Sequence, residues 1–238
     1  MGTDSSVGYN VQRWSRADVE TSNPMLRKVS AIVNKHLEHC PDHPGLRLLD
    51  VGCGNGKFAA QYLKRGIEVW GVDITPKLVT AAKKRGIRVV RHDLNKKLPL
   101  KDNFFDIITC SEVIEHVFNT EQLLRELKRV LRPGGIVVLT TPNLVGLENR
   151  LRILFGRHPS FFEYSERDAM GHIRAYSSRE LLKQAKLVGF KNIKLTGSTF
   201  PFPHEKLGIV GKLLVPALVK LADVAPHLSA HSVLVASK

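Results

Sequence analysis

A glycine-rich turn directly after a short apolar run constrains the fold more than any other feature of this chain. Residues 46–51 read LRLLDV, a run of the kind that is buried in a parallel sheet. Glycines follow at alternate positions, as Gly52, Gly54 and Gly56. Because glycine has no side chain and tolerates positive φ, the backbone can turn sharply here and approach a ligand closely. Residues 57–63 then predict a helix whose first N–H groups face the same crevice.

The spacing of these glycines helps to identify the ligand. A dinucleotide-binding turn has the pattern G-x-G-x-x-G, whereas this chain has G-x-G-x-G, with Lys57 where the last glycine would fall. The spacing therefore weakens the interpretation as a nicotinamide-dependent oxidoreductase. A glycine-rich turn that binds no ligand is the other alternative.

Strand-like and helix-like segments alternate after this turn. Further strands are predicted at residues 69–73, 88–91, 105–110, 136–140, 190–196 and 232–236. Helices are predicted at residues 76–85, with Thr75 as the cap, and at 120–131 and 178–188. Alternation of this kind predicts an α/β fold with a doubly wound, mostly parallel sheet and a ligand crevice at the carboxyl ends of its strands.

An acidic residue at the end of the second predicted strand completes a known pattern. The sequence DVGCGNG at residues 50–56, followed by Asp73, resembles motif I and the acidic residue of motif II in class I S-adenosylmethionine-dependent methyltransferases. The patterns L-P-x-x-D-x-x-F-D at 98–106 and L-x-P-G-G at 131–135 are similar to the same family. The resemblance covers residues 46–143 and is strongest to the ubiquinone- and menaquinone-biosynthesis type, in the methyltransferase type 11/23 group.

The resemblance implies a seven-stranded sheet with its last strand antiparallel, and S-adenosylmethionine as the cofactor. It implies cofactor contacts from Asp50, Gly52, Cys53, Gly54, Gly56, Asp73, Ile74, Asp93, Leu94 and Ser111. In this arrangement Asp73 accepts hydrogen bonds from both ribose hydroxyls. Asp93 contacts the adenine amine, and Leu94 and Ile74 lie against the two faces of the ring.

Acidic and imidazole side chains follow the strand predicted at residues 105–110. If a helix begins there, Glu112, Glu115 and His116 occupy positions i, i+3 and i+4 and share one face. Two carboxylates and an imidazole so close together repel one another or are solvated unless a cation joins them. This E-x-x-E-H motif looks like that of the ubiquinone-biosynthesis O-methyltransferases and the small-RNA 2'-O-methyltransferases. That likeness implies a divalent metal held by these three residues and a later histidine, for which His172 is the candidate.

Three interpretations of this group of residues stay open. Oxygen and imidazole ligands suit Mg²⁺ or Mn²⁺, whereas a zinc site more often contains cysteine. In a metal-free alternative, His116 and Glu115 act as catalytic acid and base or contact the substrate. In the third interpretation the group is structural.

The resemblance leads us to expect one methyltransferase domain over residues 1–238. Within it we assign residues 1–45 to an N-terminal lid and helix, and residues 46–143 to a cofactor-binding core. Residues 144–176 form a substrate insertion, and residues 177–238 form a C-terminal helix with strands. Tyr9, Arg13 and Trp14 would belong to the lid. In the insertion, a helix near 147–155 precedes the aromatic residues Phe161, Phe162 and Tyr164, which either hold an anionic aromatic or isoprenoid substrate or pack together.

Composition limits the cellular setting and the partners. The three cysteines are not spaced as a disulfide framework, and residues 1–20 lack the apolar core of a signal peptide, so we expect a cytoplasmic protein.

The net charge of +14 fits solvated helix faces or a nucleic-acid partner, but no aromatic-basic RNA-binding motif accompanies it. Residues 204–228 are apolar but interrupted by lysines and Pro216, which predicts core packing, a dimer contact or peripheral membrane contact rather than a membrane span.

The function that we expect from the sequence is methyl transfer from S-adenosylmethionine to a small molecule, with oxygen as the acceptor atom. Because the methyl group of a sulfonium is already activated, the protein has mainly to orient the acceptor and remove its proton. One alternative is an RNA methyltransferase that uses the basic surface. Another is a regulator that binds S-adenosylmethionine without catalysis.

Overall fold

A computed structural model describes residues 23–40, 45–160, 171–199, 217 and 219–238. Three predictions lie outside these residues. They concern the lid residues Tyr9, Arg13 and Trp14, the aromatic residues at positions 161–164, and most of the apolar segment 204–228.

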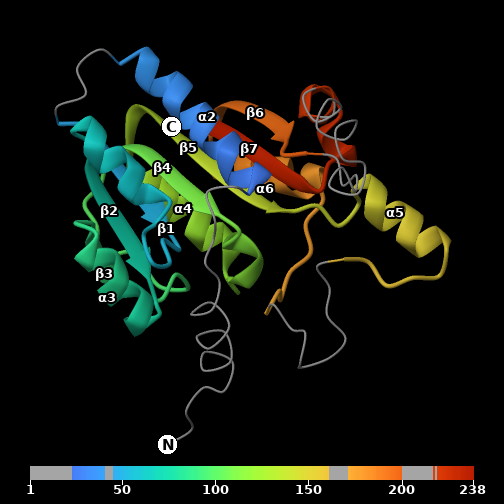
Figure 1. Cartoon of the computed structure of the whole chain (residues 1–238), viewed down its shortest axis with the longest axis horizontal. Helices are drawn as coiled ribbons and strands as arrows, with labels where there is room; N and C mark the ends of the chain where they lie inside the picture. Colours follow the sequence, from blue (N-terminus) through green and yellow to red (C-terminus); the bar gives the residue numbers. More distant parts are fainter. Residues whose placement is uncertain (1–22, 41–44, 161–170, 200–216, 218) are drawn as a thin grey trace, which may run out of the picture.

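One twisted sheet of seven strands forms the centre of the molecule (Figure 1). The strands are β1 (Arg47–Val51), β2 (Glu68–Asp73), β3 (Arg88–Arg91), β4 (Phe105–Ser111), β5 (Leu131–Pro142), β6 (Lys191–Gly197) and β7 (His231–Ser237). They are arranged in the order β3-β2-β1-β4-β5-β7-β6. The first five strands pair in parallel, whereas β7 is antiparallel to both β5 and β6. The predicted α/β fold with a reversed last strand is therefore confirmed.

Helices cover both faces of this sheet, because side chains alternate between the faces along each strand. The helices are α2 (Pro24–Glu38), α3 (Pro76–Lys84), α4 (Thr120–Val130), α5 (Leu147–Leu154) and α6 (Ser178–Val188). Leu48 belongs to the core that α2 and α3 share, and its neighbour Leu49 belongs to the core formed with α4 and α6. Both leucines are fully buried, so β1 is covered on both sides as the apolar run predicts.

Helix α2 begins at a well-defined cap. The side chain of Asn23 accepts a hydrogen bond from the backbone N–H of Met25, and Pro24 occupies the first turn. The helix buries Met25, Val29 and Val33 on one face, at helical spacing. The N-terminal end of α2 lies over the carboxyl ends of the strands, because the hydroxyl of Thr140, near the end of β5, contacts the sulfur of Met25 at 3.3 Å.

Three local predictions need correction. Residues 59–65 form a 3-10 helix, η1 (Ala59–Arg65), instead of an α-helix. The side-chain amide of Gln61 donates a hydrogen bond to the Phe58 carbonyl at 2.8 Å. The side chain of Thr75 makes no capping hydrogen bond, and α3 begins with Pro76. Strand β5 begins at Leu131, five residues earlier than predicted, because Leu131 already pairs with Phe105 of β4.

Candidate functional site

The glycine turn after β1 leaves space for a ligand at one position and none at its neighbours. Gly52 has φ +69°, and a Cβ there would lie 2.4 Å from Cγ2 of Val113. Gly54 has φ +53°, and a Cβ there would meet no atom within 4 Å. The first glycine is required by packing and by its backbone conformation, whereas the second opens the turn toward the crevice.

Two other predicted members of the turn face the protein interior. At Gly56 a Cβ would lie 2.5 Å from Cδ1 of Ile87, so close packing of α3 explains this glycine. Cys53 is buried against Gly71, and burial raises the pKa of its thiol, with Asp50 acting in the same direction. The Cys53 side chain therefore stays protonated and packs, and only its backbone can contact a ligand.

The carboxylate at the end of β2 is held in place by main-chain groups. Asp73 is nearly buried, and its Oδ2 accepts a hydrogen bond from Gly54 N at 2.9 Å while Oδ1 accepts one from Thr75 N at 2.8 Å. Each carboxylate oxygen keeps a second lone pair for another donor. The adjacent Ile74 exposes its apolar side chain at the same strand end.

The loop after β3 is tied to the segment after β4. Oδ1 of Asp93 accepts hydrogen bonds from the main chain and side chain of Asn95, at 2.9 and 3.0 Å. Asn95 in turn accepts from the backbone N–H of Phe118 at 2.8 Å, and the aromatic ring of Phe118 is exposed. The two loops thereby form one wall beside Asp93 and the half-buried Leu94.

A buried carboxyl lies beneath the turn. Asp50 accepts a hydrogen bond from the Thr109 hydroxyl at 2.7 Å. Burial raises the pKa of Asp50 to about 7; the negative charge of Asp73 adds to the increase and the Thr109 bond opposes it. A nearby cation would favour the ionised carboxylate. Two residues along β4 from Thr109, the buried hydroxyl of Ser111 makes no hydrogen bond to any part of the chain that the structure describes.

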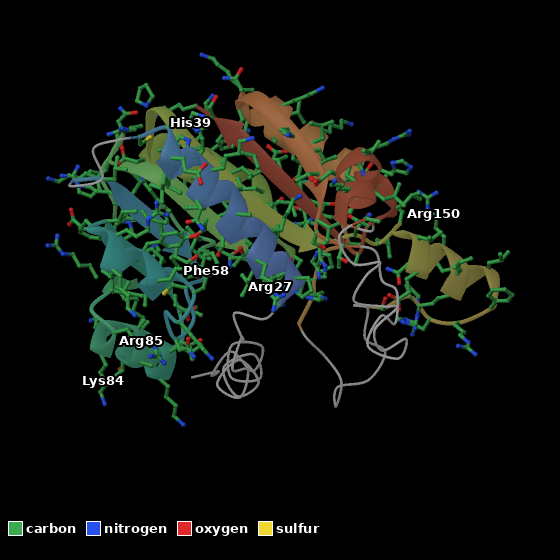
Figure 2. All side chains as sticks on the ribbon, turned by 45° about the horizontal axis from the view of Figure 1, so that its top comes forward. Arg27, His39, Phe58, Lys84, Arg85 and Arg150 are labelled. Carbon is green, nitrogen blue, oxygen red and sulfur yellow. The ribbon has the colours of Figure 1, made fainter. Side chains whose placement is uncertain are left out.

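A cavity of about 310 Å³ adjoins the turn between α2 and η1. It is lined by Leu26, Arg27, Ser30, Ala31, Asn34, Phe58 and Gln61. Figure 2 marks the two residues that define its character, the cationic Arg27 near the start of α2 and the ring of Phe58 just after the glycine turn. Arg27 could not be predicted from the sequence, because its place in the cavity depends on how α2 packs beside η1.

Three of the four predicted metal ligands meet at the carboxyl ends of β4 and β5. One ligand atom from each of Glu115, His116 and His172 lies within 4.8 Å of the others. Glu115 is 1% exposed, its Oε2 accepts a hydrogen bond from the Thr141 hydroxyl at 3.1 Å, and its Oε1 lies 3.9 Å from Nε2 of His172. A cavity of about 10 Å³, the size of one water, borders Glu115, Thr141 and His172.

The protonation states within this group follow from burial. Nδ1 of His116 lies 3.0 Å from the Gly171 carbonyl, which can only accept, so Nδ1 carries the proton and the lone pair is on Nε2. Burial lowers the pKa of His116 to about 4, and the nearby His172 acts in the same direction. Burial, together with the charge of Glu112, raises the pKa of Glu115 well above its usual range. A neutral imidazole thus lies beside a carboxyl that readily holds a proton.

The fourth predicted ligand, Glu112, lies outside this group, and the helix predicted to begin here is wrong. Glu112 has φ +55°, and its N–H donates to the Thr140 carbonyl, so pairing with β5 continues and the turn η2 (Ile114–His116) starts later. Its carboxylate accepts a hydrogen bond from the Thr140 hydroxyl at 2.9 Å and lies 3.5 Å from His231 Nε2. Nδ1 of His231 lies 3.2 Å from the Ser198 hydroxyl, a second polar group that the sequence did not predict.

Comparison with known proteins identifies the family. The model of the methyltransferase domain matches residues 49–139. An uncharacterized protein of Methanocaldococcus jannaschii is 33% identical over 159 residues, which are 66% of this chain and 70% of that protein. The ubiquinone biosynthesis O-methyltransferase of Rickettsia felis is 31% identical over 51% of this chain and 50% of its own length. The chain belongs to the S-adenosylmethionine-dependent methyltransferases.

A solved structure agrees with this methyltransferase fold. The S-adenosylmethionine-dependent methyltransferase of Archaeoglobus fulgidus superposes with a TM-score of 0.59 at 20% identity, covering 88% of this chain and 94% of the other. S-adenosylmethionine is the cofactor of this family. The methyltransferase has features that fit it: the open position at Gly54, the positioned Asp73 carboxylate, the exposed Ile74 and the unsatisfied Ser111 hydroxyl.

Proposed function

We propose that the protein transfers the methyl group of S-adenosylmethionine to an oxygen atom of a small molecule. The main supporting observation is that Glu115, His116 and His172 gather at the same edge of the sheet as the glycine turn and Asp73. A group that can take up a proton thus adjoins a crevice suited to an adenosine. When bound, S-adenosylmethionine supplies a methyl group that its sulfonium has already activated.

Cofactor binding in this proposal uses residues from the ends of β1, β2 and β3 and from helix α2. Asp73 accepts hydrogen bonds from the ribose hydroxyls, and Ile74 and Leu94 cover the two faces of the adenine, whose amine donates to Asp93. Asp50, beneath the turn, favours the positively charged amino-acid end of the cofactor. Arg27, on the wall of the adjoining cavity, offers a cation for the carboxylate of that end.

The methyl acceptor is oriented and deprotonated by the side chains at the carboxyl ends of β4 and β5. His116 is neutral at pH 7 because its pKa is about 4, and Nε2 has the lone pair that can take a hydroxyl proton. Glu115, when ionised, can take that proton from His116, because its raised pKa favours the protonated carboxyl that is buried beside Thr141. His172 completes the group and orients the acceptor oxygen.

The same three side chains fit a divalent cation. One carboxylate oxygen and two imidazole nitrogens, all within 4.8 Å of one another, form a ligand set suited to Mn²⁺ and, less closely, to Mg²⁺. Such an ion would act as a Lewis acid toward the acceptor oxygen. Glu112 is not part of this set.

Two observations support the choice of oxygen and of a small acceptor. The relative in Rickettsia felis is named as an O-methyltransferase of ubiquinone biosynthesis, and this chain spans about half of its length. A hydroxyl needs a base or a metal to become a good nucleophile, and the group around Glu115 meets that need.

The proposal is tested by incubating the purified protein with S-adenosylmethionine labelled in the methyl group and a fractionated cell extract, with and without Mn²⁺. We expect label in a low-molecular-weight fraction and a methyl ether in the labelled product. Label in RNA would favour the RNA methyltransferase alternative. Cofactor binding with no transfer to any fraction would favour the regulator.

A further inference from the structure

Helix α5 exposes its apolar side chains, in contrast to α2, α4 and α6, whose apolar faces are buried. Leu147, Leu151, Leu154 and Phe155 are 38%, 46%, 74% and 74% exposed. They are spaced i, i+4, i+7 and i+8, so they lie on one side of the helix and its end. We call these four residues the α5 apolar face. Soluble proteins seldom leave such a continuous apolar surface uncovered unless it binds something.

A polar anchor holds α5 in this orientation. Asn149 is only 2% exposed, and its side chain accepts hydrogen bonds from the N–H and hydroxyl of Ser160 at 2.7 and 2.8 Å. At the start of the helix, a Cβ on Gly146 would lie 2.5 Å from the Ser229 carbonyl oxygen, so α5 is closely packed at its N-terminal end. Asn149 therefore fixes one side of α5 through satisfied polar contacts, and the α5 apolar face lies on another side of the helix. Figure 1 shows α5 projecting beyond the sheet.

The charges around this face favour an anionic partner. Arg150, Arg152 and Arg157 lie within or just after α5, and Glu148 is the only acidic residue between positions 145 and 160. Arg150 and Arg157 are exposed, and the whole chain has a net charge of +14. Two copies of the protein meeting through this face would bring arginines against arginines. An anionic lipid surface instead pairs with the arginines and accepts the apolar side chains.

We propose that α5 docks on the surface of an anionic lipid bilayer through the α5 apolar face. Among the described residues no helix has both the length and the apolar composition needed to cross a bilayer, so the contact is interfacial. Because α5 follows β5, whose Thr141 contacts Glu115, docking brings the edge of the sheet close to the lipid. Resting on the proposed function, this placement favours an amphiphilic acceptor whose apolar part stays in the bilayer.

Vesicle flotation tests the docking without any assay of methyl transfer. The full chain is mixed with phosphatidylcholine vesicles that contain or lack phosphatidylglycerol, at low and high salt. We expect binding to the anionic vesicles that weakens with salt. The double variant Leu154→Glu, Phe155→Glu should bind at least about tenfold more weakly, since two apolar side chains are lost from the interface. The double variant Arg150→Glu, Arg157→Glu should also bind at least about tenfold more weakly.

The control is Leu187→Glu, which changes another well-exposed leucine (67%), on α6, and should bind like the wild type. Circular dichroism and calorimetric titration with S-adenosylmethionine show that each variant is folded and able to bind the cofactor. Absence of vesicle binding by the wild type, or unchanged binding by the Leu154→Glu, Phe155→Glu variant, would overturn the inference. A wild-type dimer that this variant abolishes, without vesicle binding, would show that a second copy covers the face. Vesicle binding without methyl transfer would leave the docking intact and contradict the proposed function alone.

Discussion

The strand ends of β1 and β2 are organised mainly by backbone groups of the two loops that follow these strands, whereas those of β4 and β5 depend on groups from more distant parts of the chain. Asp73 is held by the N–H groups of Gly54 and Thr75, all within one β-α-β unit. Glu115 instead depends on Thr141, 26 residues away, and His116 on Gly171, 55 residues away. We call these the cofactor half and the acceptor half of the edge.

The residues matched by the family model end before the distant partners of Glu115 and His116. The matching domain model covers residues 49–139, which include the whole turn, Asp73 and Asp93 but stop before Thr141 and His172. Glu115 and His116 lie within the matched residues, but Thr141 and Gly171, which bond to them, lie outside. The two halves should therefore respond differently to substitution, and four experiments test that separation.

The largest expected effect is on turnover in the acceptor half. Replacing His116 by asparagine removes the basic nitrogen, so methyl transfer to the labelled acceptor should fall by about 10² to 10⁴-fold. The affinity for S-adenosylmethionine should stay the same in calorimetry. The control His39→Asn changes a histidine at the far end of α2 and should leave both quantities unaltered (Figure 2). A comparable loss of cofactor affinity in His116→Asn would show that the halves are not separate.

In the cofactor half the expected effect is on affinity. Asp73→Asn weakens hydrogen bonds from the ribose hydroxyls to a charged acceptor, which should cost about 3 kcal/mol, or about 100-fold in Kd. Isothermal titration calorimetry with S-adenosylhomocysteine measures this change in Kd. The control is Asp102→Asn, which changes an exposed carboxylate paired with Arg129. An Asp73→Asn protein that binds like the wild type would remove the proposed ribose contact.

The third prediction concerns acid stability of the acceptor half. Burial holds the pKa of His116 at about 4, below the ordinary 6.5, so its contribution to stability is complete above pH 6.5 and is lost as the pH falls through 4. At about 1.4 kcal/mol per pKa unit, the loss is on the order of 3 kcal/mol. In urea unfolding from pH 7 to pH 4, the free energy of unfolding of the wild type should fall by about 3 kcal/mol more than that of His116→Asn. Parallel curves would contradict a buried neutral imidazole.

The smallest effects distinguish two glycines of the turn. Gly52→Ala places a methyl group against Val113 at a positive φ and should lower the free energy of unfolding by about 2 kcal/mol. Gly54→Ala meets open space and should cost about 1 kcal/mol for its backbone conformation alone, yet weaken cofactor binding. Thermal unfolding and calorimetry on both variants test this. Equal losses of stability, with cofactor binding unchanged in Gly54→Ala, would show that the crevice does not face Gly54.

The same distinction determines what the sequence could predict. The alternating segments and the clustering of residues from the turn to Asp93 follow from local patterns, whereas the reversed last strand follows from the resemblance to class I methyltransferases. The structure confirms the strands and the antiparallel β7. The local pattern failed at Glu112, where continued pairing with β5 prevents the predicted helix and turns the carboxylate toward His231. Arg27 and Asn95 were missed because their positions depend on the packing of segments that are distant in sequence.

A crystal structure with S-adenosylhomocysteine would test the central claim most directly. We expect the ribose hydroxyls to donate hydrogen bonds to Asp73 and the homocysteine end to lie over Gly54. We expect the sulfur to point toward Glu115, His116 and His172. A ligand bound elsewhere, or one whose sulfur faces away from these three residues, would contradict it.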